Sequence, residues 1–159
     1  MSAALITATI IGIVGLGYSA ILGFTAASAA DLFFHTSFGI FSTLVTLLSH
    51  SMTMFYLIGK GKAIREAVTE GQLSPDLYYT FARARRPVFS VATLAMMLTM
   101  ITAILGGGVD TGAIPTGVHL VIAVLAITAN LISLRVEVIA MVSSSQIVSE
   151  VDELLKEQP

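Results

Sequence analysis

The chain has 159 residues, of which 55% are hydrophobic and only 11% are charged, with a net charge of −2 and a mean hydropathy of +0.90. This composition excludes a soluble globular protein and predicts a single integral membrane domain, residues 1–159, whose surroundings are lipid and not nucleic acid. The sequence contains no cysteine, which excludes disulfides, thiolate nucleophiles and cysteine metal sites.

Four stretches are apolar enough to be transmembrane helices, which need about 20 residues each. They are residues 4–26, 32–58, 88–105 and 117–135. We therefore expect an all-α, integral membrane four-helix bundle of up-down-up-down order. Helical extensions are expected on the cytoplasmic side, in a hairpin at 59–87 and a tail at 136–159.

The first span carries a line of small residues that is typical of a close helix-packing face. These residues are Gly12, Gly15, Ser19 and Gly23. A cleaved signal peptide is the alternative, because residues 27–29 look like a processing site. The apolar run is long and has no positive residues before it, so we expect the span to be retained.

The second span has no charged residue between positions 32 and 58, yet polar and small residues recur along it at spacings of three and four. This stripe consists of Thr36, Gly39, Thr43, Thr46, His50 and Thr53. An unpaired hydroxyl or imidazole is costly in hydrocarbon, so the stripe is expected to face other helices. The apolar residues between, Phe34, Phe41, Leu48 and Phe55, are expected to face lipid or a neighbouring subunit. Ser28 or Asp31 should cap this helix.

All eight cations lie in the 59–87 hairpin or after position 134. By the positive-inside rule, the hairpin and both termini are expected to be cytoplasmic in a multi-pass cell-membrane protein. Within the hairpin we expect a helix break at residues 71–73, a restart at residues 74–76 and a kink at Pro87. Residues 106–115 form an outer loop, and Thr116 is expected to cap the last span.

The fourth span has a matching inner line, His119, Ala123, Ala126, Asn130, Ser133 and Glu137. If spans two and four both run inward, His35 and His119 lie at the same depth near the outer end. Two histidines on diagonal helices can ligate one b-type haem, for which Gly39 and Ala123 would leave room. The alternatives are another metal ion and simple interfacial histidines.

His50 lies deeper, and its expected neighbours are Asn130, Ser133 and Glu137. Ionisable groups inside a membrane are by default functional. This inner polar site is interpreted either as a structural hydrogen-bond network or as a site for protons, a quinone or a cofactor.

Two hypotheses for function remain. The chain is a haem-binding subunit for membrane electron transfer, or a cofactor-free structural or transport-associated subunit whose polar faces specify helix packing. No nucleophile with its base and no paired carboxylates are visible, so catalysis by the chain alone is not expected, and other membrane subunits or further copies are its expected partners. The layout resembles small four-helix membrane proteins such as cytochrome b type anchors in outline only, because two complete histidine pairs are missing.

Overall fold

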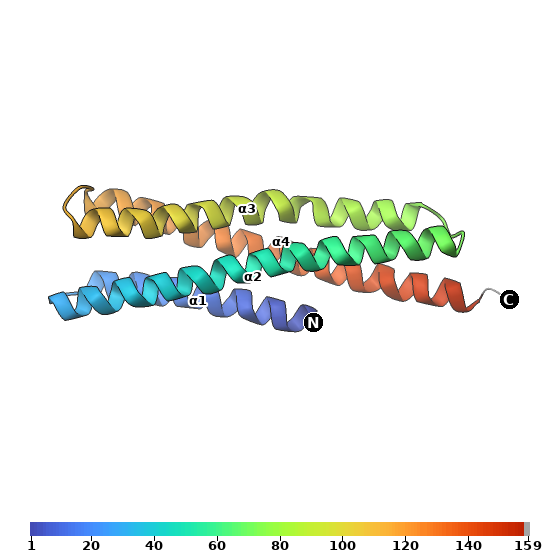
Figure 1. Ribbon diagram of the computed structural model, residues 1–159, viewed down its shortest axis with the longest axis horizontal. Helices are drawn as coiled ribbons and strands as arrows, with labels where there is room; N and C mark the ends of the chain where they lie inside the picture. The colour runs from blue at the N-terminus through green and yellow to red at the C-terminus, as the bar shows by residue number, and fades with distance from the viewer. Residues whose placement is uncertain (158–159) are drawn as a thin grey trace.

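The computed structural model describes residues 1–157, which form an all-α protein of four long helices (Figure 1). The helices are α1 (Ser2–Thr25), α2 (Ala29–Glu70), α3 (Asp76–Asp110) and α4 (Thr116–Lys156). Each contains a window apolar and long enough to cross a membrane. The predicted fold class is confirmed.

The helices run alternately up and down, and α1 is the shortest of them (Figure 1). In the described chain α1 packs on α2 and α4, α3 packs on the same two helices, and α1 and α3 do not meet. The helices α2 and α4 therefore contact each other across the centre of the bundle. Beyond the start of α1, the helices α2, α3 and α4 continue together to the end that carries the hairpin cations. We call this the basic end and the other the loop end.

Small residues let α1 approach α2 closely. A Cβ atom on Gly12 would lie 2.6 Å from the Thr46 hydroxyl oxygen, and one on Gly15 would lie 2.6 Å from that of Ser42. Gly39 takes part from the other side, where its Cβ would lie 2.9 Å from the Ser19 hydroxyl oxygen. The small-residue line of the first span is thus a helix-packing face, as predicted.

The two ends of α2 follow the sequence signals. Ser28 and Asp31 form a capping box, in which the Ser28 side chain accepts from the Asp31 N–H and the Asp31 carboxylate accepts from the Ser28 N–H. The helix ends at Glu70, and Gln72 takes a positive φ of 51° in the turn. The predicted break at residues 71–73 is confirmed.

The predicted restart of a helix at residues 74–76 is confirmed, and the predicted cap at Thr116 is wrong. The helix α3 begins at Asp76, directly after Pro75, and runs through Pro87 to Asp110. Residues 106–110, which were expected in the outer loop, are therefore helical, and the loop is limited to residues 111–115. Thr116 does not cap α4, because Pro115 occupies the cap position and Thr116 is already in the first turn. Proline has no side-chain oxygen to accept a hydrogen bond from the first-turn N–H groups, so α4 begins without a side-chain cap.

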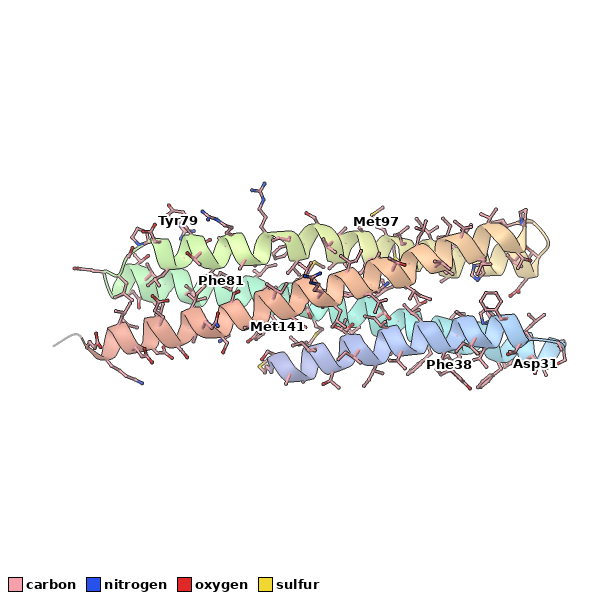
Figure 2. All side chains as sticks on the ribbon, turned by 180° about the vertical axis from the view of Figure 1, so that it is seen from behind. Asp31, Phe38, Tyr79, Phe81, Met97 and Met141 are labelled. Carbon is pink, nitrogen blue, oxygen red and sulfur yellow. The ribbon has the colours of Figure 1, made fainter. Side chains whose placement is uncertain are left out.

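Large apolar side chains cover the outside of the bundle, as lipid contact requires. The predicted lipid-facing residue Phe55 is 72% exposed and Leu48 is 64% exposed. Met97 also projects away from the helices (Figure 2). The inner stripe of α2 is buried over its middle part, at Thr43, Thr46, His50 and Thr53. Around the basic end, a compact apolar core contains Leu57, Phe81, Val88 and Ile147.

Candidate functional site

The most deeply buried ionisable groups face each other across the bundle centre. His50 on α2 is 0% exposed and Glu137 on α4 is 1% exposed, and His50 Nδ1 lies 2.5 Å from Glu137 Oε1. The pair forms because both residues belong to the inner stripes of their helices and both helices run in the same direction. A direct imidazole–carboxyl contact in an apolar interior is a charge-assisted hydrogen bond, the strong kind.

The second ring nitrogen of His50 is fixed by Asn130. The Asn130 side-chain nitrogen donates to the Ala126 carbonyl at 2.7 Å and to the Thr99 hydroxyl at 2.8 Å. Its oxygen therefore faces His50 Nε2, at 2.8 Å, and must accept a hydrogen bond from it. The proton on Nε2 is thus committed, and any proton exchanged by the ring is the one between Nδ1 and Glu137.

The Glu137 carboxyl group receives two further hydroxyl contacts. Ser133 donates to Oε1 at 3.3 Å, and the Thr9 hydroxyl lies 3.5 Å from Oε2 while also donating to the Leu5 carbonyl at 3.1 Å. With Thr9 on α1, His50 on α2, Thr99 on α3 and Glu137 on α4, the network joins all four helices. We call these six residues, Thr9, His50, Thr99, Asn130, Ser133 and Glu137, the central network.

Four members of the central network are those predicted from the sequence, and Thr9 and Thr99 are not. Both carried a usable signal. Thr9 continues the small-residue line of α1 three positions before Gly12. Thr99 follows the buried residues Ala92 and Ala95 at helical spacing.

The contact between His50 and Glu137 also bears on the expected end of the fourth span at residue 135. Glu137 lies level with His50, well inside the predicted second span, so the buried face of α4 continues past Arg135. The Arg135 side chain is exposed, and a long arginine can reach the membrane interface from within the apolar layer.

The other two histidines meet at the loop end. The rings of His35 and His119 have centroids 6.5 Å apart and are nearly perpendicular, at 81°. His35 Nδ1 donates to the Ser19 carbonyl at 2.8 Å, and its Nε2 has no hydrogen-bond partner in the described part of the chain. His119 Nδ1 is buried and has no partner among the described residues. Nearby, the Thr36 hydroxyl donates to Asp110 at 3.4 Å.

Gly39 was expected to leave room for a haem beside the histidines, but it lies against α1. Gly39 faces Ser19 on α1, and the glycines against the histidine rings are Gly23 beside His35 and Gly106 beside His119. Ala123 is half-buried one turn from His119. No cluster of three or more histidine or carboxylate ligands occurs in the described residues.

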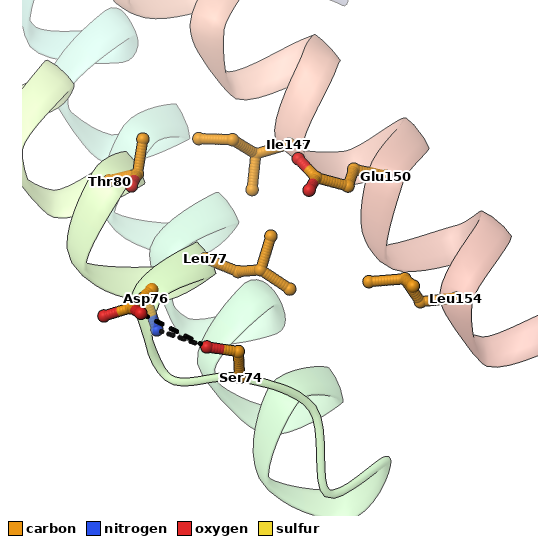
Figure 3. A pocket seen from close by; sticks show the side chains of 7 residues that line it. All are labelled: Ser74, Asp76, Leu77, Thr80, Ile147, Glu150 and Leu154. Carbon is orange, nitrogen blue, oxygen red and sulfur yellow. Dashed lines mark hydrogen bonds between the residues drawn. The ribbon is translucent and has the colours of Figure 1, made fainter.

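A shallow groove of about 290 Å³ lies at the basic end between the start of α3 and the end of α4 (Figure 3). Its walls combine apolar side chains with carboxylates. They are formed by Ser74, Asp76, Leu77, Thr80, Ile147, Glu150 and Leu154. None of the predicted site residues belongs to this groove.

Comparison of the chain with family models, curated proteins and solved structures finds no match. The central network brings a buried imidazole and a buried carboxyl group into direct contact, and among the described residues the histidine pair has two ring nitrogens without a hydrogen-bond partner, His35 Nε2 and His119 Nδ1.

Proposed function

We propose that the chain is a cofactor-free, transport-associated membrane subunit, in which the His50–Glu137 pair carries an exchangeable proton and the central network sets the helix packing. The observation that supports this is the 2.5 Å contact between two ionisable groups that are both buried. Ionisable residues inside membrane bundles are costly, and they mark ion pathways and proton relays.

The hydrogen bonds around the pair support a proton site. Asn130 holds the ring in one tautomer, while Ser133 and Thr9 contact the carboxyl oxygens. One proton can lie on either Nδ1 or Oε1 without any change in these contacts. Release of this proton would leave the Nδ1 lone pair facing the carboxylate, so net exchange with solvent requires the contact to open locally.

Infrared difference spectroscopy of the protein in lipid nanodiscs tests this proposal. We expect a carboxyl or imidazole band that responds to a change of pH and is lost in Glu137→Gln. Glu150→Gln is the matched control, because this glutamate lies on the same helix but lines the open groove. A spectrum that Glu137→Gln leaves unchanged would reduce the network to a structural role.

A second candidate is the haem subunit, favoured by the spacing of His35 and His119. With metal–nitrogen bonds of about 2 Å, two imidazoles on opposite sides of one metal have ring centres about 6 Å apart, close to the observed 6.5 Å. The Ser19 carbonyl orients His35 in the way that second-shell groups orient ligating histidines. His35 and His119 would hold a b-type haem here, and the haem would supply one-electron transfer.

A visible absorption spectrum decides between the two candidates. Protein purified with haem available should show a Soret band if the haem proposal is right, and the band should vanish in the double variant His35→Ala, His119→Ala. The band should survive in His50→Ala, because His50 has both ring nitrogens engaged. Under either proposal we expect activity only in a complex with other membrane subunits or further copies.

A further inference from the structure

Two buried hydroxyl groups near the central network have no hydrogen-bond partner in the described chain. They belong to Thr53 on α2, which is 0% exposed, and Ser144 on α4, which is 2% exposed. A buried hydroxyl without a partner costs about 1–3 kcal/mol. Internal water is the usual partner of such groups in folded proteins.

Both hydroxyls lie on the basic-end side of the His50–Glu137 pair. Thr53 is three residues beyond His50 and Ser144 is seven beyond Glu137, or about 4.5 Å and about 10.5 Å along the axis at 1.5 Å per residue. Residues three and seven apart share one face of a helix. The two groups differ in depth by about 6 Å, more than two collinear hydrogen bonds of about 2.8 Å can cover, so each hydroxyl would bind its own water.

The loop-end side of the pair differs in its hydrogen bonding. There the Thr46 hydroxyl donates to the Ser42 carbonyl, and the Thr99 hydroxyl donates to the Ala95 carbonyl, both at 2.8 Å. Their protons are committed to their own helices. Among the described residues, the buried hydroxyls without a partner lie toward the basic end, while the buried unpaired atom toward the loop end is His119 Nδ1, about 27 Å along α4 from Glu137.

We propose that Thr53 and Ser144 bind internal water, and that this water exchanges the proton of the His50–Glu137 pair with the basic end alone. This inference rests on the proton site of the proposed function. The proton leaves the pair and bonds to a water oxygen, and that water passes one of its own protons onward. A proton returning by the same route restores the pair, so no other reactant is consumed.

The route would end near Arg85. Its half-buried guanidinium donates to the Leu57 carbonyl at 3.2 Å, one turn beyond Thr53. Around this level Leu57, Val88 and Phe81 are fully buried. This apolar core separates the water sites from bulk solvent, so exchange requires the transient entry of further water from the basic end, and we expect it to be slow.

Hydrogen–deuterium exchange of the pair tests the route. The full chain in nanodiscs is moved into D2O, and the shift of the infrared band assigned by Glu137→Gln is followed in time. Thr53→Val and Ser144→Ala should each slow the shift about tenfold, equal to about 1.4 kcal/mol in the barrier. Thr46→Val and Ser49→Ala are matched controls, because both hydroxyls are buried and already donate to backbone carbonyls.

Each outcome bears on one proposal. If the band exists but Thr53→Val and Ser144→Ala exchange at the wild-type rate, the route is wrong and the proton site stands. If no band depends on Glu137, the proton site itself is wrong. Thr53→Ser, which keeps the hydroxyl, should retain the wild-type rate, so a loss of exchange through misfolding is recognised. A more stable Thr53→Val protein would mean that this hydroxyl binds no water, and would also overturn the route.

Discussion

At the scale of single residues, the buried imidazole and carboxyl groups depend on each other. Either group alone would be a polar side chain in an apolar interior without its main partner, which is among the most costly situations in a protein. The hydroxyls of Ser133 and Thr9 are too distant from Glu137 to replace the 2.5 Å contact with His50. Loss of one partner should therefore be worse than loss of both.

We expect His50→Ala to lower the free energy of unfolding by about 3–5 kcal/mol, because it leaves Glu137 buried and unpaired. The double variant His50→Ala, Glu137→Gln should lose less than the sum of the single losses. Reversible unfolding in mixed micelles measures these differences. Leu48→Ala is the control, since this side chain faces outward on the same helix. Additive losses would show that the two groups do not act as a pair.

The capping box at the start of α2 predicts how the stability of the protein depends on pH. Hydrogen bonds from the Ser28 hydroxyl and then the Ala27 N–H hold the pKa of Asp31 below its ordinary value of 3.8. A lowered pKa means that the folded state favours the carboxylate, so this contribution to stability is present above pH 3.8 and is lost as the pH falls through the lowered pKa. Titration of the Asp31 carboxyl by NMR should show the downward shift, and Ser28→Ala should move the pKa back up.

At the scale of helices, the approach of α1 to α2 should be the feature most sensitive to an added methyl group. Gly12→Ala would place a Cβ 2.6 Å from the Thr46 hydroxyl and 3.1 Å from its Cα, and overpacking of this kind costs about 1–3 kcal/mol. Gly17→Ala is the matched control on the same helix, because nothing lies within 4 Å of its Cβ. Thermal unfolding in nanodiscs should separate the two variants, and equal stabilities would contradict the close approach.

The same helices show how far the sequence can predict the structure. Periodic polar residues in an apolar run predicted the buried face of α2 and the group His50, Asn130, Ser133 and Glu137. A polar side chain within a membrane is stable where another helix supplies a hydrogen-bond partner, so it points into the bundle. Thr9 and Thr99 were missed because a single threonine in an apolar helix can also bond its own backbone carbonyl, as both do. Pairing such hydroxyls across helices requires the relative rotation and depth of the helices, which one sequence does not contain.

At the loop end, the sequence predicted the positions of the histidines better than those of the small residues around them. The depth of His35 and His119 followed from counting residues, but the role of Gly39 did not, because a glycine on an inner stripe can face either of two neighbouring helices. In the structure it faces α1 and admits Ser19. The small residues that border the histidine rings are instead Gly23 and Gly106, which belong to helices whose rotation the sequence leaves open.

At the scale of the whole molecule, charge is distributed very unevenly along the bundle. The cations of the hairpin lie at the basic end, and Lys156 ends the tail there, while the described loop end carries only the carboxylates Asp31 and Asp110. Each lysine or arginine near an anionic leaflet contributes about 1 kcal/mol of attraction. The placement of lysine and arginine, more than the net charge, sets the orientation of such a bundle.

We therefore expect the basic end to face the cytoplasm, with the C-terminus on that side and the loop between α3 and α4 outside. A reporter fused after the last residue should be active only in the cytoplasm, and one inserted at residues 112–114 only outside. Replacing Lys60, Lys62 and Arg65 by glutamine should weaken the preference and produce a mixed population, because it removes three of the cations that retain the hairpin. Replacing Asp31 and Asp110 by asparagine is the control and should leave the orientation unchanged, since acidic residues contribute little to it. A C-terminal reporter that is active only outside would reverse the assignment, and the water route from Thr53 and Ser144 would then lead to the outer face of the membrane.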